Sequence, residues 1–203
     1  MKNKSKKKMK YILLMWAMTA MPLKAELPLG KFDNMSFFPE TGDEGGYEIT
    51  LKKTGSSFAG ELVYAAGERQ PAEKLQNITC NEKTGSCEFK CKTLSATQNC
   101  SLLKVEGGVI LFLKADKKAA LLAVTGKPIA PAKEDAALGA VGVGYITGDK
   151  VRFRGKPSTK GEIFFEFSRL TKVGIIGRTD DYKWTHIVYK GKIGYVANEF
   201  ITE

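Results

Sequence analysis

The sequence predicts an all-β protein in which a small antiparallel β-domain with disulfides precedes a second small β-domain. Between Leu27 and Gly126, short runs of alternating apolar and polar residues are separated by glycine, aspartate and asparagine, as in YEITLKK. This pattern is typical of an antiparallel meander, folded as a half-open barrel or a sandwich. The only helix candidate is EDAALGAV, from Glu134, which is short and contains a glycine.

Residues 1–25 predict a cleaved secretory signal peptide. The segment MKNKSKKKMK is basic without any acid and leads directly into the apolar run YILLMWAMTAMPL. An uncleaved membrane anchor is the alternative, but a transmembrane helix needs about 20 apolar residues and this run is shorter. No other apolar run is long enough to cross a bilayer. We therefore expect a periplasmic or secreted protein with no membrane span after cleavage.

The net charge becomes small once the signal is removed. The whole chain has a formal net charge of +10, but residues 1–25 contain seven lysines and no acid, which leaves 25 basic and 22 acidic residues, or +3. This balance argues against a nucleic-acid-binding protein, which normally has a clustered basic face. Residues 139–203 carry 11 basic and 7 acidic groups, so this part is the one expected to meet an anionic polymer.

All four cysteines lie within 21 residues, at Cys80, Cys87, Cys91 and Cys100. An even, clustered set in an exported chain predicts two disulfides, and the spacings lack the paired short knuckles of common zinc sites. The turn in NEKTGS favours pairing Cys80 with Cys87 across a hairpin, and Cys91 with Cys100. Cys87 and Cys91 would lie on one face of their strand, so a nested pairing remains open.

The segment KPIAPAKED contains two prolines and no clear periodicity, which indicates a linker. We therefore divide the chain into the signal peptide, a β-rich N-terminal domain at 26–126, a linker at 127–138 and a C-terminal domain at 139–203.

The C-terminal domain follows one continuous pattern of strands and turns. ITGDKVRFRGKPST opens it, EIFFEF and TKVGIIGR follow, and YKWTHIVYKGKIGYVANEFI closes it. This order resembles the bacterial SH3 (SH3b) domain family, whose first strand commonly carries an arginine before a Pro-Ser turn, matched here by Arg154, Pro157 and Ser158. The family's closing hairpin is matched by Trp184, Ile187, Gly191, Gly194, Tyr195, Val196 and Phe200. The resemblance implies an SH3-like β-barrel over about 60 residues.

The matched residues also have physical roles that need no family name. Pro157 fixes φ in a loop that leaves one strand and returns as the next, and Gly191 allows the positive φ of a tight hairpin. The sequence departs from the family pattern at Leu170, where glycine is frequent, and at His186, where lysine or an apolar residue is frequent. On an alternating pattern, the barrel interior would be filled by Phe164, Phe167, Val173, Ile175, Ile187, Val196 and Phe200.

Aromatic rings with basic neighbours suit a peptide that carries carboxylates. Some of these residues could equally belong to the core. The candidate ligand-binding residues are Tyr145, Arg152, Arg154, Trp184 and Tyr195.

No catalytic constellation is recognisable, and we expect neither enzymatic activity nor a cofactor or metal. His186 is the only histidine and lies within a predicted strand, away from the cysteines. Nucleophilic catalysis by cysteine requires a base, and zinc hydrolases usually use several imidazoles. Glu40, Asp43 and Glu44 gather in a glycine-rich turn that we interpret as a solvated loop, with weak calcium binding as the alternative.

These observations lead to an exported, non-catalytic binding or adaptor protein. Its C-terminal module would dock on peptidoglycan peptides or on an envelope protein, which is the function commonly associated with the family. The alternative is a secreted or periplasmic inhibitor or effector that acts through its cysteine-rich N-terminal domain. A hydrolase hidden in residues 26–126 is a third hypothesis.

Overall fold

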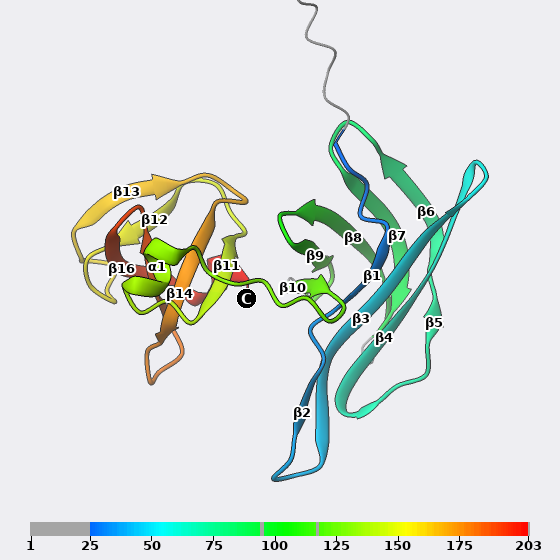
Figure 1. Ribbon diagram of the computed structural model, residues 1–203, viewed down its shortest axis with the longest axis horizontal. Coiled ribbons are helices and arrows are strands. Elements are labelled where there is room, and N and C mark those ends of the chain that lie inside the picture. Colours follow the sequence, from blue (N-terminus) through cyan, green and yellow to red (C-terminus); the bar gives the residue numbers. More distant parts are fainter. Residues whose placement is uncertain (1–24, 94–95, 117, 203) are drawn as a thin grey trace, which may run out of the picture.

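The computed structural model describes residues 25–93, 96–116 and 118–202, and nearly all of its regular structure is β-strand. The strands form two sheets that lie side by side, joined by a segment that carries the short helix α1 (Lys133–Ala137) (Figure 1). The all-β prediction is therefore confirmed. The predicted signal peptide, except for its last residue, lies outside the described residues. None of the helices in the described ranges is long and apolar enough to cross a membrane.

The first sheet is an antiparallel meander, which we call the first barrel. Its strands follow the order β5-β4-β3-β1-β10-β9-β8-β7-β6, and β2 adds to β3. Their bounds are β1 Gly30–Asp33, β2 Ser36–Phe38, β3 Asp43–Thr54, β4 Ser57–Arg69, β5 Glu73–Lys74, β6 Gln76–Asn81, β7 Ser86–Lys92, β8 Thr97–Val105, β9 Gly108–Leu113 and β10 Lys118–Val124.

The first barrel closes on itself through a kinked strand. β5 and β6 stand at opposite ends of the strand order, yet only Leu75 separates them in the chain. The Leu75 N–H donates to the Gly60 carbonyl in β4 at 2.9 Å, while Gln76 pairs with Lys90 in β7. The chain therefore passes from one end of the sheet to the other at this point. The sequence left open a half-open barrel or a sandwich, and the structure shows a barrel that is nearly closed.

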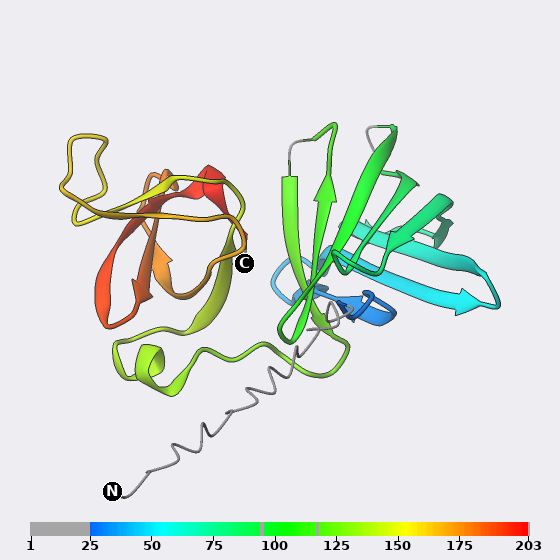
Figure 2. The ribbon, with the colours of Figure 1, turned by 90° about the horizontal axis from the view of Figure 1, so that it is seen from above.

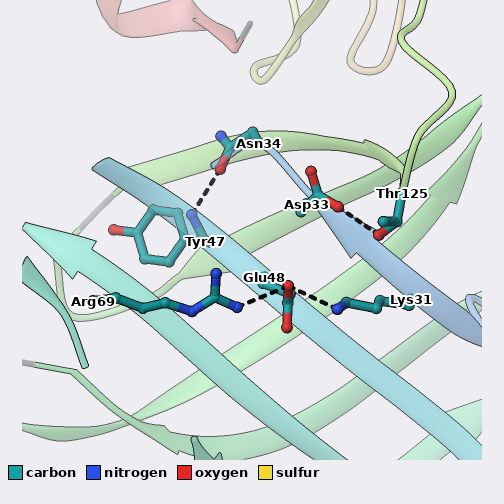
Figure 3. Close-up of polar contacts among 7 residues, drawn as sticks. All are labelled: Lys31, Asp33, Asn34, Tyr47, Glu48, Arg69 and Thr125. Atoms are coloured by element: carbon teal, nitrogen blue, oxygen red, sulfur yellow. Dashed lines mark hydrogen bonds and ion pairs between the residues drawn. The ribbon is translucent and has the colours of Figure 1, made fainter. Parts of the chain in front are cut away.

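Strand β1 is held between β3 and β10 by side chains as well as by backbone pairing (Figure 3). Glu48 on β3 forms ion pairs with Lys31 on β1 at 2.9 Å and with Arg69 on β4 at 3.0 Å. The Thr125 hydroxyl, just after β10, donates to the Asp33 carboxylate. Partial burial raises the pKa of Glu48, but the hydrogen bonds and charges of Lys31 and Arg69 outweigh it and leave this pKa below its ordinary value.

The interior of the first barrel is filled by aliphatic residues and by cysteine sulfur. Cys80 and Cys87 lie directly opposite each other, with 4.0 Å between their Cα atoms, and Cys91 bonds to Cys100 on the next strand across 6.2 Å. This is the sequential pairing that the hairpin turn favoured, and the nested pairing does not occur. The buried cluster consists of Phe32, Ile49, Leu51, Leu62, Leu75, Cys87, Phe89, Cys91, Cys100, Leu102, Val109, Leu111, Leu113 and Leu122.

The second sheet forms a smaller barrel, which we call the second barrel. Its strand order is β13-β12-β16-β15-β14-β11-β17, and all of its pairings are antiparallel. Figure 2 shows its strands curled around an interior that is separate from that of the first barrel. The bounds are β11 Gly142–Ile146, β12 Val151–Arg154, β13 Ile163–Phe167, β14 Lys172–Arg178, β15 Trp184–Tyr189, β16 Lys192–Ala197, the 3₁₀ turn η1 Asn198–Phe200, and β17 Ile201–Thr202.

Aromatic rings dominate the core of the second barrel. Phe153 is fully buried and has edge contacts with Phe164 and Phe165 and a tilted contact with Phe167, at centroid distances of 5.3 to 5.4 Å. Five of the seven residues predicted to fill this barrel are buried in it, and Phe164 packs at its edge. Phe200 is a correction, because η1 turns its ring outward and leaves it 39% exposed.

The two barrels touch through an apolar contact and several polar ones. Ile110 and Leu121 on the outer face of the first barrel pack with Val143 and Tyr145 of β11. The Thr202 hydroxyl of β17 donates to the Ala119 carbonyl of β10 at 3.2 Å. The predicted linker at 127–138 includes α1 and ends shortly before β11. The two barrels are therefore joined both by this short segment and by direct contact.

Candidate ligand-binding groove

A groove crosses one end of the second barrel, where three connections meet. The loop between β12 and β13, the turn between β14 and β15, and η1 form its walls. It consists of two adjoining recesses with volumes of about 820 and 420 Å³. These volumes match those of small-ligand and peptide sites. The residues shared by both recesses are Thr159, Trp184, Ala197 and Glu199.

Trp184 forms the floor of the groove. It is the first residue of β15, and it pairs across the sheet with Ala197, the last residue of β16. Because a methyl group stands opposite the indole, that side of the ring is not covered by a bulky neighbour. The side chain is only half-buried, so an amphipathic aromatic surface faces the groove.

Asp181 organises the turn that forms one wall. Its Oδ1 accepts hydrogen bonds from the Thr179 hydroxyl at 2.7 Å and from the Lys183 N–H at 3.1 Å. The Thr179 bond, followed by the Lys183 backbone bond, lowers the pKa of Asp181. Tyr182 lies between these partners with φ of 55° and remains 67% exposed. The turn therefore holds an aromatic ring outward at the edge of the groove.

Arg154 lies under the opposite wall. Its side chain is only 6% exposed, and its Nη1 donates to the Gly161 carbonyl of the covering loop at 2.9 Å. A guanidinium has five N–H donors, and within the described residues no carboxylate lies at ion-pair distance from this one. Arg154 also lines the smaller recess, so a largely desolvated positive group faces a potential ligand.

The comparison with known families identifies this barrel. Residues 149–202 match the family model described as the bacterial SH3 domain. The second barrel is a bacterial SH3 domain. The match covers the C-terminal region alone and leaves the first barrel without a family match. Neither the curated proteins nor the solved structures contain a match to the chain.

Three of the five residues predicted to bind a ligand line the groove of the SH3 domain: Arg152, Arg154 and Trp184. Arg152 is exposed, and its Nε lies 3.6 Å from a carboxylate oxygen of Glu166. Exposed pairs of this kind contribute little stability, so the guanidinium can exchange Glu166 for another anion.

Tyr195 lies beside the groove, on the same outer face as Trp184. It pairs with His186 across β15 and β16, and the two rings stack at a centroid distance of 4.6 Å. Burial lowers the pKa of His186, which favours the neutral imidazole, and the ring presents an aromatic surface. Tyr195 and His186 thus extend the aromatic face of Trp184 along the sheet.

Tyr145 is not part of the groove. The ring is only 3% exposed, at the contact between the two barrels, and its hydroxyl donates to the Glu106 carbonyl at 3.0 Å. Burial, with a smaller effect of the Glu106 charge, raises the pKa of Tyr145 to about 12. The burial of Tyr145 could not be predicted from the sequence, because the residues that cover its ring belong to the first barrel. Conversely, Phe200 was assigned to the core but lines the groove.

The acidic turn predicted as a solvated loop lies on the hairpin of β2 and β3, far from the groove. Glu40 and Asp43 are exposed there, and Glu44 is half-buried. Within the described residues, no three histidine, cysteine or acidic side chains gather in a way that could hold a metal ion. The groove is therefore the site from which we argue function.

Proposed function

We propose that this protein is a non-catalytic binding protein whose SH3 domain docks on peptide segments of peptidoglycan. Bacterial SH3 domains are binding modules that are often associated with the cell wall. The observation that carries the proposal is the pairing of an open tryptophan floor with the desolvated guanidinium of Arg154. An aromatic surface next to an arginine suits a short peptide, because the ring packs against apolar side chains while the guanidinium binds a carboxylate.

The disulfides support a location outside the cytoplasm. Both bridges, Cys80–Cys87 and Cys91–Cys100, lie within or against the core of the first barrel. Disulfides persist in oxidising compartments such as the periplasm or the extracellular medium. A location in the periplasm would give the groove access to peptidoglycan.

A fluorescence titration tests the proposal directly. Trp184 is the only tryptophan after residue 25, so a chain without residues 1–25 carries its single indole in the groove. We expect a soluble muropeptide with one stem peptide to change the emission saturably. Binding should persist at about 0.15 M salt, where the Debye length of about 8 Å weakens exposed charge attraction.

Co-sedimentation with purified peptidoglycan supplies the mutational control. Trp184→Ala should abolish retention, whereas Phe37→Ala, which removes an exposed ring on the first barrel, should leave it unchanged. Arg154→Lys keeps the charge but loses the planar fork, and we expect it to weaken binding about tenfold, which corresponds to roughly 1.4 kcal/mol. If folded protein is not retained, the ligand is not peptidoglycan, and an envelope protein becomes the leading partner.

One observation favours the second candidate, an inhibitor or effector that acts through the N-terminal domain. The hairpin of β2 and β3 projects from the first barrel (Figure 1), and Phe37 and Phe38 on it are 62% and 49% exposed. Adjacent exposed rings are typical of binding surfaces. Loss of activity with Phe37→Ala, but not with Trp184→Ala, would transfer the function to this hairpin.

A further inference from the structure

The groove of the SH3 domain does not end at η1. A third recess, of about 460 Å³, lies on the far side of this turn and shares Glu199 and Phe200 with the groove. Its opposite wall belongs to the first barrel and includes Phe112 on β9, with Lys114 just after β9 and Lys118 at the start of β10. The same exposed ring of Phe200 thus borders a surface from each barrel.

This junction between barrels is built from specific contacts. The Arg169 guanidinium lies 4.8 Å from the centroid of the Phe112 ring, and its backbone N–H donates to Asp149 at 3.0 Å. Behind the recess, Lys172 of the SH3 domain forms an ion pair with Glu106 of the first barrel at 3.1 Å. With the hydroxyl bonds of Tyr145 and Thr202 and the apolar cluster described above, these contacts fix the recess before any ligand arrives, which lowers the cost of binding.

The residues that line the three recesses include seven basic groups and four carboxylates, and this excess of basic groups favours an anionic ligand. Some basic groups are already paired, as Arg152 is with Glu166 and Lys114 is with Glu88 at 3.0 Å. In the described part of the chain, no carboxylate lies at ion-pair distance from the side chains of Arg154, Arg169, Lys118 or Lys150. Arg154 and Lys150 line the groove, whereas Arg169 and Lys118 line the third recess. Two unpaired basic groups therefore stand on each side of η1.

We propose that the first barrel completes the binding surface of the SH3 domain, so that the groove and the third recess together hold one extended peptide with carboxylates at two separated positions. This inference rests on the proposed function and extends it. One carboxylate contacts Arg154, the chain passes over Trp184 and Phe200, and the second carboxylate contacts Arg169 and Lys118. Two stem peptides joined by a cross-link are long enough to present such groups, and a single stem is not expected to reach both.

The test compares two soluble muropeptides, a monomer with one stem peptide and a cross-linked dimer with two. Binding to the chain without residues 1–25 is measured by Trp184 fluorescence and by calorimetry. We expect the dimer to bind about tenfold more tightly than the monomer, equivalent to roughly 1.4 kcal/mol of additional contacts. A twofold gain would be the statistical result of two equal stems and would overturn the proposal.

Charge-reversal substitutions test whether the second carboxylate of the ligand binds at Arg169 and Lys118. Lys118→Glu and Arg169→Glu should each remove most of the preference for the dimer while leaving monomer affinity within about twofold, because exposed contacts act locally. Lys90→Glu is the matched control, since it makes the same charge change on an exposed outward position of β7. It should leave both affinities unchanged.

The outcomes separate this inference from the proposed function. If the monomer binds and the dimer gains nothing, or if the preference survives both reversals with the fold intact, the first barrel does not contribute and the SH3 domain acts alone. If neither muropeptide binds to folded protein, both proposals fail together. A preference lost equally in Lys90→Glu would show a general charge effect and would also overturn the inference.

Discussion

The first barrel and the SH3 domain meet the same physical demand, the burial of a β-sheet face, in different ways. The first barrel uses long strands, such as β3 and β4, and cross-links its neighbouring strands β6, β7 and β8 with disulfides. The SH3 domain has shorter strands around a cluster of aromatic rings centred on Phe153. A few large rings can fill a small interior because each one buries a large area.

The two barrels also differ in where a binding surface can form. In the SH3 domain three connections, the β12–β13 loop, the β14–β15 turn and η1, converge on Trp184. In the first barrel the inward positions are occupied by core side chains and the strands are joined mostly by tight turns. Its contribution to binding therefore lies on its outer face and at its edges, where Phe112 and the β2–β3 hairpin are found.

The largest expected effect tests whether the two barrels unfold independently. Phe153→Ala removes the central ring of the SH3 core and should lower its free energy of unfolding by about 3 to 5 kcal/mol. In the chain without residues 1–25, denaturant unfolding followed by Trp184 fluorescence reports on this domain, and far-ultraviolet circular dichroism reports on both. A separate, unshifted second transition would show independent barrels, and a single shifted one would show that their contact couples them.

The first barrel should respond more moderately to loss of its buried cross-link. The paired substitutions Cys91→Ala and Cys100→Ala open a loop with a sequence separation of 9 residues. We expect a loss of about 2 to 4 kcal/mol, chiefly through the gain in freedom of the unfolded chain. Fluorescence of Trp184 in native conditions should not change. A changed emission would mean that the groove depends on the order of the first barrel.

Tyr145→Phe tests the contact between the two barrels. Loss of the hydroxyl bond to Glu106 should cost about 0.5 to 1.5 kcal/mol. The pKa of Tyr145 is raised to about 12 from an ordinary value of 10.0, so its contribution is complete below pH 10 and is lost as pH rises toward 12. Thermal unfolding at pH 8 and near pH 11 should show the difference between wild type and variant shrinking. A constant difference would contradict a buried, neutral phenol.

The smallest effect concerns the ion pairs that hold β1 in the first barrel. Glu48→Gln should cost about 0.5 to 1 kcal/mol at neutral pH, because both partners are partly exposed. The pKa of Glu48 is lowered in the folded state, so this contribution is present above its ordinary pKa and is lost as pH falls through the folded value. Denaturant unfolding of wild type and variant should therefore converge at acidic pH. Divergence would indicate a different role for the carboxylate.

The sequence predicted those features that depend on neighbouring residues. The turn in NEKTGS was sufficient to indicate the cysteine pairing, because Cys80 and Cys87 face each other across one hairpin. The motif around Trp184 was sufficient to indicate the SH3 domain. The pairing of β1 with β10 could not be predicted, since these strands lie at opposite ends of the domain's sequence and no local pattern specifies that partner.

Errors at the site had a common cause. Tyr145 was placed in the binding surface and Phe200 in the core, and alternation within a strand indicates only which residues share a face. Contact with a second domain buries Tyr145, and the 3₁₀ turn before β17 reverses the expected direction of Phe200. Arg154 lines the groove, and its bond to Gly161 shows that it also supports the loop above it.

The pairing of β1 with β10 also sets an order for folding. The bond between Asp33 and Thr125 joins residues 92 apart in the sequence. One edge of β1 therefore stays unpaired until the strands between β1 and β10 have assembled. Contacts of such long range slow folding, because the loop has to be closed before they form. The three consecutive strands β6, β7 and β8, which both short-range disulfides cross-link, can form first as a local nucleus. A chain cut short before β10 would then leave the edges of β1 and β9 unpaired, which makes incomplete chains prone to aggregation.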